Sequence, residues 1–379
     1  MSFLEYNVKF TPTGWRKVLY LNWALILLVA AVACFGFLML YSVSGGQTDQ
    51  WARPQMERFA LGLVAMLGVA FVPIWFWRNM SLLAYVVSIL LLIYVEFFGV
   101  TGGGAQRWID LGFTRLQPSE IAKITVVMML AAYYDWLDLD KVSNPIFVLI
   151  PLGIIGVPVM LTVLQPDLGT AVLILWGGGA VIFLAGVHWA YFASVIGLSA
   201  AGVAAVFASR GTDWAILADY QYRRIDTFLD PSSDPLGAGY HITQSQIALG
   251  SGGWTGRGFM QGTQIRGDFL PEAHTDFIFP TLAEEFGFLG GSSLLLLYML
   301  ILMFCVHTAL MARDRYASLL VLGIAVSFFL YFGVNMAMVM GLAPVVGVPL
   351  PLVSYGGSAM LVLLVAFGLV QSAHVHRPR

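Results

Sequence analysis

The chain has 379 residues, of which 59% are hydrophobic and 11% are charged, and its formal net charge is −2. Because a soluble domain carries roughly 25% charged residues, this composition excludes a soluble globular protein and predicts several membrane spans. The small net charge gives no indication of a nucleic-acid partner, and none is expected. Any anionic ligand must be bound by local groups of arginine.

Ten segments are predominantly apolar over about the 20 residues that a membrane-spanning helix needs. In chain order they are about Val18–Tyr41, Phe59–Trp77, Leu82–Val100, Ser119–Trp136, Ile146–Leu164, Leu168–Val187, Trp189–Ser209, Thr281–Ala312, Ser318–Met340 and Ser358–Ala373. We therefore expect an all-α, polytopic membrane protein with ten transmembrane helices, forming a single domain over residues 1–379.

The basic residues of the short loops and tails predict the orientation, since such residues favour the cytoplasmic side. With both termini in the cytoplasm, nine of them face inward: Lys9, Arg16, Lys17, Arg78, Lys141, Arg313, Arg315, Arg377 and Arg379. Four face outward: Arg53, Arg58, Arg107 and Arg115. This orientation is favoured, and it places Trp108, Asp167, Asp276 and the stretch Pro344–Pro351 outside.

One long polar segment, about residues 210–276, joins the seventh and eighth predicted helices on the outer side. A connection of this length in an otherwise economical chain suggests a functional loop. It contains Arg223, Arg224, Arg257 and Arg266. We expect much of it to lie on the membrane surface, the alternative being a solvated loop.

The end of this loop brings His274, Asp276, Glu284 and Glu285 close together in sequence. Ionisable groups at a membrane boundary are costly, which favours a functional role. The spacing of Thr281 and Glu284 matches a capping box. It predicts a helix that begins near Thr281, or earlier, at Thr275, with Pro280 in its first turns. Asp276 then lies at or before a helix N-terminus, which favours the ionised carboxylate; a simple capping role remains the alternative.

Further acids and bases recur near the outer face. Glu120 and Lys123 are three residues apart, share a helical face and are expected to pair, although such a pair can be purely structural. Asp167 lies at the break between the fifth and sixth helices. Guanidinium groups bind phosphate oxygens well, and a carboxylate can act as a general base. The residues alone predict glycosyl or phosphoryl transfer on a lipid-linked substrate, or a transporter with buried ion pairs.

Three features near the C-terminus carry structural predictions. Asn335, in the middle of the ninth helix, is expected to make an interhelical hydrogen bond. The prolines of Pro344–Pro351 exclude a continuous helix, because each proline lacks a backbone donor. Ser358 is predicted to cap the last helix.

Several stretches together resemble the SEDS family (shape, elongation, division and sporulation proteins). They are Gln106–Ile109, Gln117–Glu120 with Lys123, Gln165–Thr170, Asp234–Tyr240, Pro271–Phe279 and Gly347–Gly357. They follow the family order over nearly the whole chain. The last stretch looks like that of the elongation branch, and the division branch is the competing assignment. Pro280 and Ala343 depart from the usual family residues.

The resemblance implies a peptidoglycan glycosyltransferase in the bacterial inner membrane, with its active site facing the periplasm. The implied substrate is lipid II, and the implied partners are a class B penicillin-binding protein, other elongation-complex membrane proteins and membrane lipids. Asp276 matches the essential aspartate of the family and is the expected catalytic base. The expected substrate-binding residues are Trp108, Glu120, Lys123, Asp167, Arg223, Arg224, Arg257, Arg266, His274 and Ser354. No cofactor is certain, and a divalent cation, Mg or Mn, is the open expectation; a lipid II flippase and a scaffold are the alternative functions.

Overall fold

The computed structural model describes residues 14–102, 105–110, 112, 115–212, 214–215, 219–230, 234, 237–267, 269–270 and 272–377. In this part of the chain, seven helices are long and apolar enough to cross a membrane. They are α1 (Trp23–Val43), α3 (Ile74–Phe98), α5 (Pro145–Leu164), α7 (Trp189–Ser209), α11 (Ile278–Met311), α12 (Arg315–Val339) and α13 (Gly357–Val375). The helices α2 (Arg53–Phe71), α4 (Pro118–Trp136) and α6 (Leu168–Leu184) are shorter or more polar. The chain is therefore a multi-pass membrane protein that is mostly helical.

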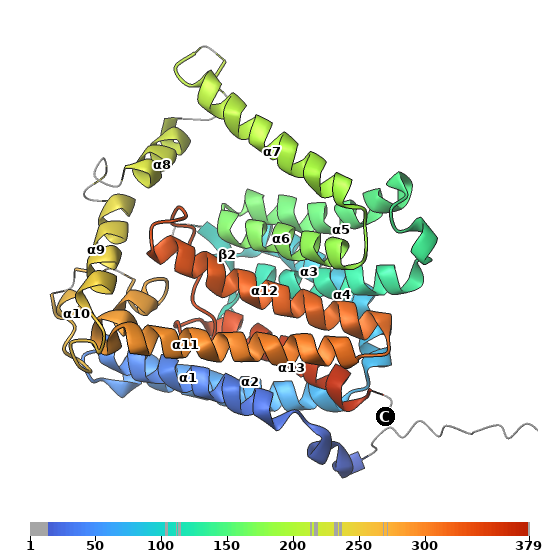
Figure 1. Ribbon diagram of the computed structural model, residues 1–379, viewed down its shortest axis with the longest axis horizontal. Helices are drawn as coiled ribbons and strands as arrows, with labels where there is room; N and C mark the ends of the chain where they lie inside the picture. Colours follow the sequence, from blue (N-terminus) through green and yellow to red (C-terminus); the bar gives the residue numbers. More distant parts are fainter. Residues whose placement is uncertain are drawn as a thin grey trace, which may run out of the picture.

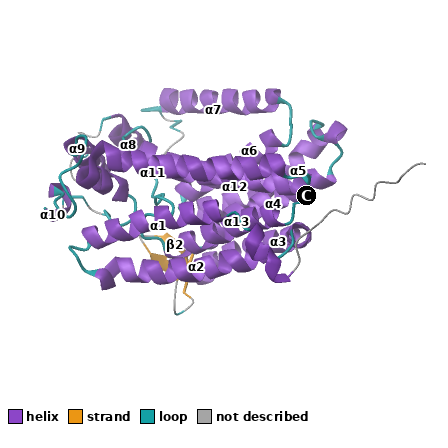
Figure 2. Ribbon diagram, turned by 60° about the horizontal axis from the view of Figure 1, so that its bottom comes forward, coloured by secondary structure: helices purple, strands orange, loops and turns teal. Residues whose placement is uncertain are grey.

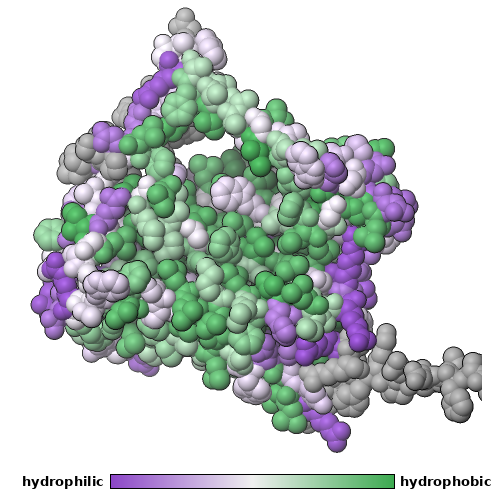
Figure 3. Space-filling model, viewed as in Figure 1, coloured by the Kyte–Doolittle hydropathy of each residue, from purple (hydrophilic) through white to green (hydrophobic). Residues whose placement is uncertain are grey.

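The helices form a bundle whose members run side by side (Figures 1 and 2). The face of the bundle seen in Figure 3 is broadly hydrophobic, and hydrophilic residues are concentrated at its left and right edges. α4 lies at the centre and is buried over most of its length, packed against α3, α6 and α12. α13 packs closely on α2, where a side chain at Gly368 would come within 2.8 Å of the Met66 carbonyl oxygen.

The seventh helix stands apart from this bundle (Figure 1). Only 6% of the residues in its most apolar window are buried. Since an apolar helix that buries so little against protein must be covered by something else, lipid is expected to surround α7 on most sides.

Two predicted helix boundaries are wrong. The predicted second span, Phe59–Trp77, crosses a real break at Val72 and Pro73, where α2 ends and α3 begins. The residue before a proline disfavours the helical conformation, and Val72 is extended, with ψ of 131°. Of the two predicted starts of the eighth helix, Thr281 is also wrong, because α11 begins at Ile278, between Thr275 and Thr281, with Pro280 in its first turn. The Thr281 hydroxyl donates to the carbonyl of Phe277, which is the N-cap.

The prediction of an all-α fold misses a small antiparallel sheet between α3 and α4. Its strands β1 (Val100–Gly102), β2 (Ala105–Asp110) and β3 (Arg115–Leu116) lie in the order β1-β2-β3. Trp108 pairs with Val100, and Asp110 pairs with Arg115. The strands are too short for their alternation to stand out in the sequence, but they fix the side chains of β2 beside the N-terminus of α4.

In the described residues of the long segment between α7 and α11 there are three helices. They are α8 (Asp219–Leu229), α9 (Ala238–Ser251) and α10 (Thr263–Arg266). α9 packs on α11 and on the C-terminal end of α12, where Ser245 donates to the Val339 carbonyl over 2.7 Å. α9 therefore covers one end of the bundle.

Basic residues predicted to face the cytoplasm gather at the opposite end. Arg78 pairs with Asp135 at 2.9 Å, and Arg315 donates to the Leu137 carbonyl that ends α4. Two short 3-10 helices lie there, η1 (Gly14–Tyr20) and η3 (Leu139–Lys141). Lys9 and Arg379 are outside the described residues.

Candidate active site

A polar cavity of about 960 Å³ opens at the end of the bundle where the sheet lies. Its walls come from β2, the N-termini of α4 and α6, the loop before α11, and the stretch that leads into α13. The acidic lining residues are Asp110, Glu120, Asp167, Glu272 and Asp276, and the basic ones are Arg58, Arg107 and Arg115. Both signs of charge thus face one space.

Asp276 is the penultimate residue before α11, whose N-cap is Phe277. The backbone around it is held by three successive hydrogen bonds. The carbonyl of His274 accepts from the Tyr355 amide at 2.8 Å, that of Thr275 from the Ser354 hydroxyl at 2.5 Å, and that of Asp276 from the Asn335 amide at 2.9 Å. With its backbone fixed by these three hydrogen bonds, the loop presents the side chain of Asp276 to the cavity.

The environment of the Asp276 carboxyl suits a proton acceptor. Burial, and then the negative charge of Glu272, raise the pKa of Asp276 to about 6, while Arg107 acts in the opposite direction. Within the described residues, the carboxylate oxygens accept no hydrogen bond. Gly347, with φ of 71°, keeps the adjoining space open, because a side chain there would lie 3.7 Å from Asp276 Oδ2. A general base works best with a pKa near the working pH.

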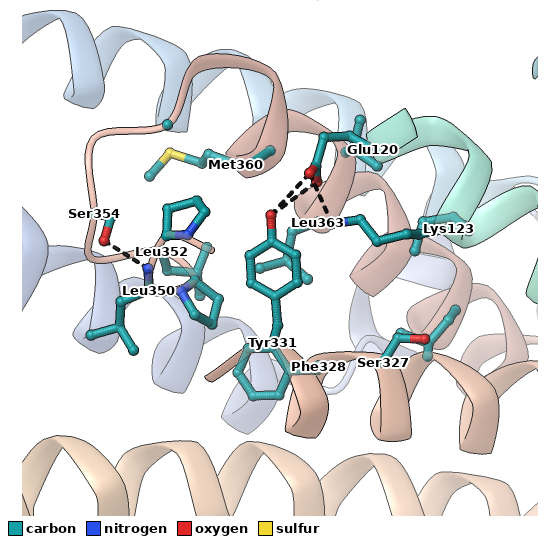
Figure 4. Close-up of a pocket in the computed structure, with 17 residues that line it drawn as sticks. Glu120, Lys123, Ser327, Phe328, Tyr331, Leu350, Leu352, Ser354, Met360 and Leu363 are labelled. Atoms are coloured by element: carbon teal, nitrogen blue, oxygen red, sulfur yellow. Dashed lines mark hydrogen bonds and ion pairs between the residues drawn. The ribbon is translucent and has the colours of Figure 1, made fainter. Parts of the chain in front are cut away.

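Glu120, Lys123 and Tyr331 form a closed group between α4 and α12 (Figure 4). Lys123 Nζ donates to Glu120 Oε1 at 2.8 Å, which confirms the predicted pair. The Tyr331 hydroxyl donates to both Glu120 oxygens at 3.1 Å, and Lys123 Nζ lies 3.9 Å from the centre of the Tyr331 ring. Glu120 and Tyr331 line both the polar cavity and a second, narrow, mostly apolar pocket of about 40 Å³, whereas Lys123 lines only the second pocket.

Asp167 occupies the opposite wall as the N-cap of α6. Its carboxylate accepts from Gln117 Nε2 at 2.7 Å and from the Thr170 amide at 3.3 Å. Arg107 Nη1 approaches it at 3.6 Å. These three contacts fix the Asp167 carboxylate and hold Arg107 beside it in the wall of the cavity.

The arginines of the cavity retain unused donors. Among the described residues, Arg107 Nε and Arg58 Nη1 are buried and have no hydrogen-bond partner. The Arg58 guanidinium lies 4.8 Å from the centre of the Tyr355 ring. Buried polar groups in proteins are nearly always paired, so the two free donors point to an anionic ligand that supplies the missing acceptors.

The structure brings together some of the predicted site residues and separates others. Trp108, Glu120, Asp167, His274 and Asp276 line the polar cavity. Ser354 is buried beneath the loop and faces the narrow pocket instead. Arg223 and Arg224 lie on α8, and their side chains are outside the described part of the chain.

Arg257, Arg266 and the two adjacent glutamates belong to a second polar cluster, which does not line the cavity. Fully buried Glu284 accepts from the Thr263 amide at 2.8 Å and lies 3.8 Å from Arg257 Nε. Arg266 donates to the Met260 carbonyl at 3.1 Å. Glu285 accepts from Ser42 on α1. This cluster fastens the α9–α10 segment to α11, so sequence proximity to Asp276 is misleading here.

Sequence reasoning missed several lining residues. Three of them are arginines on the predicted outer side, and this outward bias is itself a signal for an anion site: Arg58, Arg107 and Arg115. Tyr331 could not be recognised from the sequence, because it lies within an apolar span. Its polar role comes from the hydrogen bond that its hydroxyl donates to Glu120.

No group of three or more His, Cys, Asp or Glu side chains converges to hold a metal ion in the part of the chain that the structure describes. The acids of the cavity are instead each engaged by a nitrogen or hydroxyl donor or, like Asp276, stand alone. Among the described residues, no set of three such side chains is therefore in place to hold a resident divalent cation.

Comparisons with known proteins extend over almost the entire chain. A family model described as a cell cycle protein, and named for FtsW, RodA and SpoVE, matches residues 22–379. The chain is 42% identical over 367 residues to the peptidoglycan glycosyltransferase MrdB of Escherichia coli K12, and the match covers 96% of each.

Several solved structures are similar in fold, among them the following two. One is a chain from a peptidoglycan synthase complex described as coordinating polymerization and crosslinking. It has a TM-score of 0.80 and 31% identity, and the match covers 93% of this chain and 97% of that one. The other is the rod shape determining protein RodA of Thermus thermophilus, with a TM-score of 0.70 and 28% identity over 94% of this chain and 97% of that one.

Proposed function

This chain belongs to the FtsW, RodA and SpoVE family of cell cycle proteins, and we propose that its polar cavity polymerises lipid II into β-1,4-linked glycan strands during cell elongation. It is accordingly a peptidoglycan glycosyltransferase. The observation that carries the proposal is the immobilised backbone of His274, Thr275 and Asp276, which aims one unpaired carboxylate with a raised pKa into a cavity lined by arginines.

In the proposed reaction, Asp276 accepts the proton of the acceptor sugar 4-hydroxyl. The oxygen attacks the anomeric carbon of the donor from the face opposite the pyrophosphate. The bond from the anomeric carbon to the pyrophosphate oxygen breaks, so the α-linked donor becomes a β-1,4 linkage with inversion. Undecaprenyl pyrophosphate leaves with the electron pair, and Asp276 returns the proton to solvent.

The arginines stabilise the leaving group in this proposal. Arg107 and Arg58 supply the free donors, and Arg115 adds positive charge at the same wall. Guanidinium groups bind phosphate oxygens in a bidentate geometry. The described acids form no metal cluster, so a divalent cation used in the reaction would be brought by the pyrophosphate. Polymerisation in the presence of EDTA measures whether a divalent cation is required.

Ten helices cross the inner membrane in this account, namely the seven long apolar ones together with α2, α4 and α6. Both termini lie in the cytoplasm and the cavity faces the periplasm, as the basic residues at the opposite end support. A class B penicillin-binding protein is the proposed partner, because a structurally similar chain comes from a complex described as coordinating polymerization and crosslinking.

The direct test is polymerisation of purified lipid II by the purified chain in detergent, with and without the transpeptidase. A glycan product supports the glycosyltransferase function. It also excludes a flippase as the explanation, because detergent provides no second compartment into which lipid II could be moved. Unchanged lipid II under both conditions would contradict the proposal.

The pH dependence follows from the raised pKa of Asp276, about 6. The base acts only when deprotonated, so kcat/KM should be maximal above pH 7 and should fall about tenfold per pH unit once the pH drops well below 6. Initial rates of lipid II consumption across a buffer series measure this. A rate that stays constant to about pH 4.5, near the ordinary range of a free carboxyl, would contradict the assignment.

Replacing Arg107 by glutamine should weaken leaving-group binding. Loss of a hydrogen bond to a charged group should lower kcat/KM by about 10–100-fold. Because Arg107 lowers the pKa of Asp276, the acid limb should also move to higher pH. Arg53→Gln is the matched control, since Arg53 is exposed and, among the described residues, bonds only Asp49 and Glu57. Equal kcat/KM values for Arg107→Gln and Arg53→Gln would show that Arg107 does not act in the site.

A further inference from the structure

One face of the η2 and α2 segments packs against the joint behind Asp276, where the loop of His274 meets the loop of Tyr355. η2 (Thr48–Ala52) is a single turn of π-helix that runs directly into α2. Its Trp51 is followed by Gln55 and Arg58, and steps of four and three residues place side chains on one helical face. Gln55 Nε2 donates to the Ser354 carbonyl at 2.8 Å, and Arg58 lies over the Tyr355 ring.

Trp51 contacts both loops that meet at this joint. Its indole stacks on the His274 ring with centroids 4.1 Å apart and planes 19° apart. The same indole meets the Tyr355 ring edge-on at 4.7 Å. The Tyr355 amide in turn donates to the His274 carbonyl. Stacked and edge-on aromatic pairs have preferred geometries and therefore orient each other.

We infer that Trp51 is a positioning residue for glycosyl transfer, which fixes the His274 ring and through it the loop that presents Asp276. The inference rests on the proposed function of the cavity. Trp51 itself does not line the cavity, whereas His274, Tyr355 and Arg58 do. Its effect must therefore pass through those side chains.

The groups around the loop determine the protonation state of the His274 ring that stacks on Trp51. Glu272 Oε2 lies 4.0 Å from His274 Nε2, while Arg107 and Glu272 act on Asp276, and Tyr331 and Arg58 line the same cavity. Burial lowers the pKa of His274, against the opposing effect of Glu272. At neutral pH the ring is thus neutral and adds no positive charge beside the base.

The first test does not depend on activity. Histidine ring resonances of the full-length protein, which has six histidines, are followed by NMR and assigned with His274→Gln. The His274 signal should be shifted upfield by the Trp51 ring current and should titrate below the ordinary range of histidine. Trp51→Leu should abolish the shift and raise the titration point, whereas Trp51→Phe should keep most of both. A His274 signal unchanged in Trp51→Leu would overturn the inference.

The second test measures polymerisation of lipid II. In Trp51→Leu, a displaced near-attack geometry should lower kcat about tenfold. KM should change less than twofold, and the acid limb of the pH profile should move. Trp51→Phe should recover most of the rate. Trp75→Leu removes a half-exposed tryptophan of α3 and should keep the wild-type rate. Wild-type kcat and an unchanged pH profile in Trp51→Leu would overturn the inference. A wild type that makes no polymer would instead refute the proposed function, while the NMR test still decides the role of Trp51.

Discussion

Asp276→Asn should lower kcat for lipid II polymerisation by about 10²–10⁴-fold, the usual contribution of general-base assistance. The amide has nearly the shape of the carboxyl but cannot accept the hydroxyl proton. Substrate binding should change little, because the arginines that face the pyrophosphate are untouched. Single-turnover rates with saturating enzyme measure this step directly.

Stability separates a catalytic loss from a folding defect. Burial raises the pKa of Asp276 above its ordinary value, so the ionised form is disfavoured in the folded state, and above pH 6 its charge opposes folding. The Asn variant should therefore melt at the same temperature as the wild type, or higher, at pH 8. Glu57→Gln, an exposed acid on α2, is the control for activity. Normal polymerisation by Asp276→Asn would refute the role of this carboxylate.

Asn335→Leu should have the second-largest effect, because one amide holds two loops. Asn335 Nδ2 donates to the Asp276 carbonyl at 2.9 Å and to the Val348 carbonyl at 2.7 Å. Leucine leaves both carbonyls unpaired, each at a cost of about 1–3 kcal/mol. A shift of Asp276 on the order of 1 Å should lower kcat by about 100-fold.

Thr308→Val is the matched control for Asn335→Leu. Thr308 is also buried in a long apolar helix, but its hydroxyl donates only to the Phe304 carbonyl of its own helix. Melting temperature and kcat are measured for both variants. If Asn335→Leu polymerises like the wild type, the fixed backbone of the loop is not needed for the reaction.

The sequence predicted the elements that depend on local patterns. The Glu120–Lys123 pair needs only a three-residue spacing on one helix, and the structure confirms it. The non-helical stretch Pro344–Pro351 follows from the missing donors of proline and is also confirmed. The family resemblance pointed to Asp276, and the structure places it in the polar cavity.

Features that depend on tertiary contacts were not predictable in the same way. Asn335 was expected to bond a neighbouring helix, but its acceptors are two loop carbonyls. Ser358 was expected to cap α13, but Gly356 is the N-cap. The Ser358 hydroxyl instead accepts from the backbone amide of Gln117. Glu284 lies eight residues after Asp276 yet serves a different cluster. Each of these partners is distant in sequence or turned to another face.

The contacts of Ser354, Tyr355 and Asn335 hold the loop before α11 in place. A loop at a membrane surface would ordinarily be mobile, and a mobile base would lose most of the benefit of proximity. Ser354 and Tyr355 bind it from one side and Asn335 from the other. The bundle thus turns a loop residue into a fixed one.

A structure of Asp276→Asn with lipid II bound tests the central claim most directly. The account predicts the acceptor 4-hydroxyl within about 2.6–3.2 Å of the residue-276 side chain, with the pyrophosphate against Arg107 and Arg58. A sugar hydroxyl directed toward another acid, or a pyrophosphate bound outside this cavity, would contradict it.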